Sequence, residues 1–247
     1  MSNVTPGSGV REAFFQDLGR IDYQKAWDYQ ERLLKQNVQL KSDGQGEQTV
    51  HHLLFCEHPP VITLGKSGHP ENLLLTDELL LEKGISYVKT NRGGDITFHG
   101  PEQIVGYPIF DLEKMFTDIG RYLRSLEEAV ILTLAEYGVR GDRSPGETGV
   151  WIEPHDKLRA RKICAMGVRC SRWVTMHGIA FNVNTDLAYF NYIIPCGIRD
   201  KQVTSLKQEL GHEVPVEEVK ALMKEKFAQV FQLHYSEVPY LSTVSGI

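Results

Sequence analysis

The chain has 247 residues, of which 27 are Lys or Arg and 32 are Asp or Glu, so its formal net charge is −5. This charge supplies no large positive field to hold a phosphate backbone, which disfavours nucleic acid as a partner. Hydrophobic residues make up 41% and charged residues 24%, a composition typical of a globular protein with a packed core. No apolar stretch approaches the roughly 20 residues that a membrane helix needs, so we expect no membrane span.

The N-terminal segment and the cysteines indicate the compartment. The segment MSNVTPGSGVREAFFQDLG lacks the basic start and apolar stretch of a signal peptide, which predicts a cytoplasmic protein. The four cysteines form no CxxC pair and are expected to stay reduced there, so a special cysteine is a reactive one and not a cross-link. We expect a single domain over residues 1–247, with residues 1 to about 17 as a loosely ordered tail.

The pattern of apolar residues predicts these elements in chain order. An amphipathic helix covers residues 23–40, and two strands in VHHLLFCEHPPVITLG flank the Pro59-Pro60 corner. A short helix in TDELLLEKG, capped by Thr76 and ended by Gly84, precedes the strand ISYVKT. A long helix covers residues 117–137, three strands lie in GVWI, RKICAMGVRC and HGIAFNVN, and Pro215 opens a last helix.

The order of these elements predicts the fold class. Strands and helices interleave without the regular βαβ rhythm of a doubly wound sheet, and no GxGxxG or GxxxxGK[ST] motif follows a strand. We therefore expect an α+β fold with a mixed β-sheet flanked by helices.

A glycine-rich segment follows the strand ISYVKT and is interpreted as a loop that forms a substrate-binding wall. Glycines without Cβ atoms let a ligand approach the backbone, and side chains such as Arg92 supply hydrogen-bond donors. The alternative is an ordinary glycine-rich turn with an ion-paired arginine. The binding residues expected from this segment are Arg92, Gly93, Gly94, Asp95, Ile96, Thr97, Phe98 and His99.

Two further residues carry the expected catalytic chemistry. Cys196 lies between Pro195 and Gly197, in a turn that can present its sulfur rigidly, and a thiolate exchanges readily with a thioester. Lys162 lies on a predicted strand, on the same side as Cys164 and Met166, where a desolvated amine near a thiol favours the thiolate. The alternatives are an inert buried thiol and a surface lysine.

Histidines are the remaining candidates. His177, followed by Gly178, Ile179 and Ala180, is open to three interpretations, as catalytic base, binding group or structural residue, and we assign it to binding. His51, His52, His58 and His69 form neither HExxH nor a Cys/His zinc spacing, so no metal is predicted.

In combination, these segments resemble the lipoyl(octanoyl) transferases, which move octanoyl from an acyl carrier protein to a protein lysine in lipoate biosynthesis. The resemblance covers nearly the whole chain. It rests on LGRIDYQKAW, CEHPPVITLGKSG, NRGGDITFHGPEQIVGYPIFDL, GVWI, RKICAMGVR, MHGIAFNVNTDL and IIPCGI. Asp95 and Glu102 depart from the family pattern, which often has glutamine at the first position and usually glycine at the second.

The resemblance implies that Cys196 holds an octanoyl thioester and that Lys162 lowers the pKa of its thiol. It implies a fold similar to biotin and lipoate protein ligases, with no metal or nucleotide because the donor thioester is already activated. The acyl chain is then expected against the glycine-rich segment and against Ala165, Met166, Gly167, Gly178, Ile179 and Ala180.

The expected donor is the phosphopantetheine thioester of an acyl carrier protein. The expected acceptors are lipoyl domains of 2-oxoacid dehydrogenase complexes or the glycine cleavage H protein. Three other functions stay open: an amidotransferase between lipoyl-domain proteins, an ATP-dependent lipoate ligase, and a non-catalytic module that binds acyl carriers or lipoyl domains.

Overall fold

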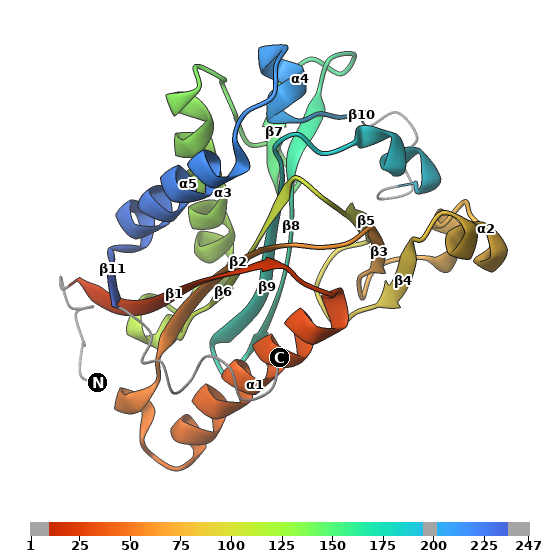
Figure 1. The fold of residues 1–247 in the computed structure, drawn as a ribbon. Helices are drawn as coiled ribbons and strands as arrows, with labels where there is room; N and C mark the ends of the chain where they lie inside the picture. Colours follow the sequence, from red (N-terminus) through yellow and green to blue (C-terminus); the bar gives the residue numbers. More distant parts are fainter. Residues whose placement is uncertain (1–9, 195–201, 237–247) are drawn as a thin grey trace.

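The computed structural model describes residues 10–194 and 202–236, and its centre is one large mixed sheet (Figure 1). The strand order is β10-β8-β9-β6-β2-β1-β11, and β7 pairs with β8 at the β10 end. The pairs β2–β6, β6–β9 and β8–β9 are antiparallel, whereas β1 is parallel to both its neighbours. The strands are β1 (Arg11–Arg20), β2 (His51–Glu57), β6 (Gln103–Ile109), β7 (Val150–Ile152), β8 (Arg161–Ser171), β9 (Val174–Asn182), β10 (Gln202–Val203) and β11 (Leu233–Ser236).

Helices cover both faces of this sheet (Figure 1). Helix α1 (Tyr23–Ser42) packs on one face, and α3 (Ile119–Glu136) and α5 (Val216–Phe231) pack together on the other. A short helix, α4 (Leu206–Leu210), precedes α5. The three long helices expected from the apolar periodicity are thus confirmed, as are the strands predicted for β2, β7, β8 and β9.

A second, smaller sheet has the order β4-β3-β5 and lies beside α2 (Asp77–Glu82). Its strands are β3 (Val61–Leu64), β4 (Ser86–Lys89) and β5 (Ile96–His99). The expectation of a loop throughout the glycine-rich segment was therefore wrong for its second half. Ile96 and Phe98 alternate into a hydrophobic cluster with Ile62, which makes a paired strand the stable conformation there.

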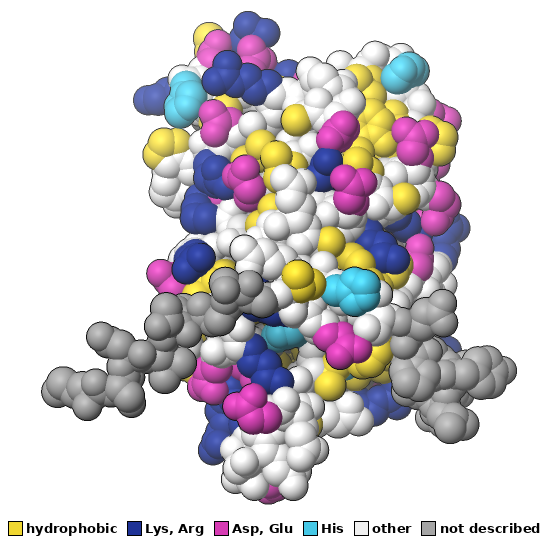
Figure 2. All heavy atoms as spheres, turned by 90° about the vertical axis from the view of Figure 1, so that its left-hand side faces the viewer, with side chains coloured by type: hydrophobic (Ala, Val, Ile, Leu, Met, Phe, Trp, Pro, Cys, Tyr) yellow, Lys and Arg dark blue, Asp and Glu magenta, His cyan; other side chains and the backbone are white. Residues whose placement is uncertain are grey.

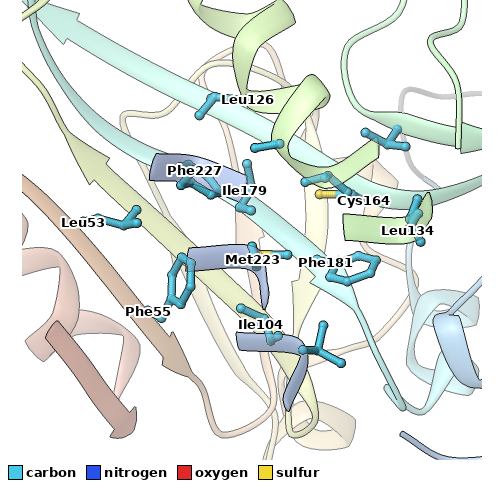
Figure 3. Close-up of a cluster of buried hydrophobic side chains, with 14 of the residues drawn as sticks. Leu53, Phe55, Ile104, Leu126, Leu134, Cys164, Ile179, Phe181, Met223 and Phe227 are labelled. Carbon is cyan, nitrogen blue, oxygen red and sulfur yellow. The ribbon is translucent and has the colours of Figure 1, made fainter. Parts of the chain in front are cut away.

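The main hydrophobic core lies between the large sheet and helices α3 and α5 (Figure 3). Phe55, Ile179 and Phe181 of the sheet meet Phe227 of α5 and Leu126 of α3. Burying each such side chain contributes about 1.5–3 kcal/mol. A second cluster, under α1, packs on the opposite face, so the central strands β6 and β9 are buried on both sides.

Residues 11–17, expected as part of a loose tail, instead form most of β1. Ala13 is fully buried, and the Phe15 ring packs edge-on against Phe55 and Tyr235. The partners of β1 are β2 and β11, and β11 lies near the other end of the chain. This pairing is long-range, and the local pattern does not reveal it. Residues 1–9 lie outside the described residues.

No helix in the described parts of the chain is both long and apolar enough to span a membrane. Figure 2 shows the side of the molecule on which α3 and α5 lie, where acidic and basic side chains are interspersed.

Glu102 provides a stability test, because it adopts a left-handed conformation with φ 59°. This conformation destabilises a residue that has a Cβ by roughly 1–2 kcal/mol. Glycine relieves the strain, but its greater backbone freedom in the unfolded chain offsets part of the gain. We expect Glu102→Gly to raise the free energy of unfolding by about 0.5–1 kcal/mol, measured by urea denaturation. The control Glu82→Gly, at the end of α2, is expected to lower it. A loss of stability in Glu102→Gly would contradict the strain.

Candidate active site

A cavity of about 420 Å³ lies on the face of the large sheet that α1 covers. Its floor is formed by β8 and β9 at positions with very small side chains. Ala165 pairs with Ala180, and Gly167 pairs with Gly178. Because Ala165 and Ala180 carry only a Cβ atom, space stays open above this pair, whereas the backbone at Gly93 and Gly106 lies directly against Gly167 and Gly178. The apolar floor suits a hydrocarbon chain.

The first half of the glycine-rich segment forms the roof of this cavity. The Gly93 amide donates to the Val168 carbonyl at 2.9 Å, and Arg92 donates to the Thr63 carbonyl at 2.8 Å. A Cβ on Gly167 would lie 2.5 Å from the Gly93 carbonyl oxygen. This close approach explains the glycine at position 167, and a Cβ on Gly93 would in turn lie 3.2 Å from the Val168 carbonyl oxygen.

The structure brings nearly all the predicted site residues to this cavity, although their roles stay predictions. Phe98 is the exception among the described residues, because alternation along β5 turns its ring into the small-sheet cluster, where it stacks on Tyr189 at 4.5 Å. Cys196 lies outside the described residues. The cavity-lining residues predicted from the sequence are Arg92, Gly93, Gly94, Asp95, Ile96, Thr97, His99, Lys162, Ala165, Met166, Gly167, His177, Gly178, Ile179 and Ala180.

Lys162 stands at the edge of the cavity formed by β7, β8 and β10. Its Nζ lies 4.6 Å from the centre of the Trp151 ring, a contact that attracts a cation. Val203 of β10 is its register partner, and the Thr204 amide donates to the Lys162 carbonyl at 2.9 Å. Cys164, two residues further along β8, is buried in the main core. Burial raises the pKa of this thiol far above its usual range, which makes it a poor nucleophile.

A chain of buried hydrogen bonds fixes His99 beside the cavity. Both N–H groups of the Gln103 amide donate, to the Phe98 carbonyl at 3.1 Å and to Asn182 Oδ1 at 2.9 Å. The Gln103 oxygen therefore accepts from His99 Nδ1 at 2.9 Å, which leaves His99 Nε2 as an acceptor. The Thr63 hydroxyl donates to this nitrogen at 3.3 Å.

The same series of hydrogen bonds reaches Thr204, directly after β10 and next to Lys162. Asn182 Nδ2 donates to the Thr204 carbonyl at 3.0 Å. A second pair lies nearby, where His58 Nδ1 donates to the Ile21 carbonyl and the Tyr107 hydroxyl donates to His58 Nε2, both at 2.7 Å. Buried polar groups paired in this way form a rigid wall.

His177 is buried, with its backbone at φ 57°. Asn91 donates through Nδ2 to Glu31, so its oxygen faces His177 and accepts from Nε2 at 2.7 Å. Burial, followed by the charges of Arg92 and Arg169, lowers the pKa of His177 to about 3. A neutral imidazole with so low a pKa is a weak base at neutral pH, which favours the binding and structural interpretations over the catalytic one.

Sequence reasoning missed several residues that line the cavity, although many of them lie in the quoted motifs. Tyr23 lies in LGRIDYQKAW, Gln103 and Tyr107 lie in NRGGDITFHGPEQIVGYPIFDL, and Asn182 lies in MHGIAFNVNTDL. The signal in the sequence that could have identified these residues is a polar side chain within an otherwise apolar segment. The residues that were missed are Tyr23, Gln103, Val105, Tyr107, Leu123, Gly146, Glu147, Thr148, Val168, Asn182, Phe190 and Val203.

Buried and half-buried histidines predict an acid-sensitive fold. Burial lowers the pKa of His51, His52 and His58 to about 4. Because the unfolded chain takes up these protons near pH 6.5, their stabilising effect is full above pH 6.5 and is lost as the pH falls toward 4. His52→Phe should lessen the loss between pH 7 and 4 by on the order of 3 kcal/mol, measured by urea denaturation. An unchanged pH dependence would contradict this assignment.

Filling the cavity tests its role directly. In Ala180→Leu the larger side chain projects into the open space, so we expect octanoate to bind at least tenfold more weakly by calorimetry, with little loss of thermal stability. The control Ala135→Leu, on the exposed surface of α3, should bind octanoate like the wild type. Unchanged affinity in Ala180→Leu would mean that the chain binds elsewhere.

Comparisons with known proteins agree with this geometry. Residues 22–228 match the lipoyl protein ligase A/B catalytic domain family. An octanoyltransferase of Christiangramia forsetii is 57% identical over 227 residues, which are 90% of this chain and 97% of the relative. An octanoyltransferase of Flavobacterium psychrophilum is 59% identical over 221 residues, 87% of this chain and 95% of the relative.

Solved structures show the same fold at low sequence identity. A bipartite lipoate protein ligase from Thermoplasma acidophilum has a TM-score of 0.67 at 16% identity, covering 93% of this chain and 88% of that one. A biotin protein ligase from Aquifex aeolicus has a TM-score of 0.53 at 14% identity, covering 89% and 70%. The expected α+β fold is thus confirmed. With its cavity, its fold and these sequence matches, the chain belongs to the octanoyltransferases of the lipoyl protein ligase A/B catalytic domain family.

Proposed function

We propose that this octanoyltransferase takes octanoyl from the phosphopantetheine thiol of an acyl carrier protein onto Cys196 and passes it to a lysine of a lipoyl domain. Octanoyl transfer in protein lipoylation is the activity of its relatives, and it makes lipoyl-domain proteins the acceptors. We assign these acceptors to 2-oxoacid dehydrogenase complexes or the glycine cleavage H protein, and the reaction to the cytoplasm, where thiols stay reduced.

The observation that supports a cysteine–lysine pair is the position of Lys162. Its side chain lines the end of an apolar-floored cavity, beside a strand whose residue Val203 comes seven positions after Cys196. On the other side of Cys196, Phe190 also lines the cavity. The chain on both sides of the cysteine therefore reaches the cavity, which makes a Cys196 thiol beside Lys162 the simplest source of a nucleophile there.

The proposed reaction has two transfers with balanced protons. Lys162 takes the thiol proton, and the Cys196 thiolate attacks the donor thioester. The bond from the carbonyl carbon to the pantetheine sulfur breaks, and the released thiolate takes the proton back from Lys162. The incoming ε-amine then attacks the Cys196 thioester, gives its proton to Lys162 and forms the amide, while the Cys196 thiolate leaves and takes that proton from Lys162 to restore the thiol. The thioester is already activated, so the proposed reaction uses no nucleotide and no cofactor.

Lys162→Ala and Cys196→Ala test this proposal in transfer from octanoyl-acyl carrier protein to a lipoyl domain. We expect Cys196→Ala to abolish transfer. Lys162→Ala should lower it by about 100-fold at pH 7, with partial recovery above the ordinary thiol pKa of about 8.5, where the thiolate forms unaided.

Matched controls for these two variants are Cys170→Ala, at an exposed cysteine, and Lys224→Ala, on α5. Both should transfer octanoyl at the wild-type rate. Full transfer at pH 7 by Lys162→Ala would remove the lysine from the mechanism, and transfer by Cys196→Ala would remove the thioester.

A further inference from the structure

The cavity runs across the strands from Lys162 on β8, over β9, to β6, where Tyr23 of α1 joins its lining. Two inter-strand spacings measure roughly 10 Å. Three bonds of an extended chain span about 3.6 Å, so the seven carbon–carbon bonds of octanoyl span roughly 8 Å. If the carbonyl lies beside Lys162, as in the proposed function on which this step rests, the chain ends over β6 near Tyr23.

Tyr23 is held rigidly at this end of the cavity. It is the first residue of α1, directly after Asp22, whose side chain caps the helix by accepting from the Lys25 amide. Its ring stacks on His99 with centres 5.8 Å apart and packs edge-on against His58 at 5.2 Å. The position of the hydroxyl is therefore set by ring packing and not by a hydrogen bond of its own.

The Tyr23 hydroxyl makes no hydrogen bond within the described residues. Two neighbouring polar side chains are already paired, since His99 uses both ring nitrogens and Tyr107 donates to His58. On the same helix, the Tyr29 hydroxyl is also paired, with Gln16 at 2.5 Å. Burial raises the pKa of Tyr23 to about 12, so the phenol stays protonated at neutral pH and both donates and accepts.

We propose that Tyr23 is a specificity-determining residue whose hydroxyl contacts the far end of the bound chain. A saturated chain one carbon longer than octanoyl places a methyl group against this hydroxyl and removes its water without offering a partner. An eight-carbon chain that ends in a hydroxyl or thiol has the same length and supplies that partner. The cavity therefore prefers eight-carbon chains, and among longer ones it prefers those with a polar end.

The test compares two chains with the same number of heavy atoms, 8-hydroxyoctanoyl and nonanoyl, as acyl carrier protein thioesters in competition for a lipoyl domain. The quantity compared is kcat/KM for the hydroxyl-ended chain divided by kcat/KM for nonanoyl. We expect this ratio to be about five- to tenfold higher in the wild type than in Tyr23→Phe, which is the effect of one hydrogen bond. The control Tyr29→Phe should keep the wild-type ratio. Calorimetry with the free acids should give the same order.

An equal ratio in wild type and Tyr23→Phe would overturn the proposal, and so would an equal change in Tyr29→Phe. Failure of the proposed function has a different signature. If no thioester is transferred, the donor assignment fails, while the binding ratio of the free acids still decides the role of Tyr23.

Discussion

The register between β8 and β9 is the constraint on which the rest of the site depends. It pairs Ala165 with Ala180 and Gly167 with Gly178 on the cavity face, and it sends Cys164 and Phe181 into the main core. A slip by one residue would exchange the two faces of a strand. Larger side chains would then fill the cavity, and the core would lose its apolar contacts. Fold stability and an open site therefore select the same register.

The two faces of the sheet have different tasks. The face under α3 and α5 is packed with large apolar side chains, which supply most of the burial. The face under α1 carries the cavity and a wall of paired polar groups, including His58, His99 and Gln103. Such a wall is compatible with a stable fold only when its polar groups have hydrogen-bond partners, because an unpaired buried polar group costs about 1–3 kcal/mol. The wall thus sets the shape of the cavity, and its buried histidines make the folded protein less stable in acid.

The sequence predicted the elements that rest on local patterns. Helices α1, α3 and α5 show clear apolar periodicity, and the strands β8 and β9 alternate, so the small residues of the floor were found together with them. Features that depend on pairing between distant segments were not predicted. β1 depends on two distant partners, and the inward turn of Phe98 depends on pairing between β5 and β3.

Tyr23 shows the same limit within the site. At the start of an amphipathic helix it has the spacing of a core residue, and only the packing of α1 on the sheet brings it to the cavity. Glu102 is the converse, since its departure from glycine was visible in the sequence but its left-handed backbone was not. In both cases the residue is visible in the sequence, whereas its position or its backbone conformation depends on the packing around it.

The most direct test is a crystal structure of the protein after reaction with octanoyl-acyl carrier protein. The account predicts an octanoyl thioester on Cys196, its carbonyl beside Lys162, and its chain between the floor of Ala165 and Ala180 and the roof at Gly93. An adduct on another residue, or a chain outside this cavity, would contradict it.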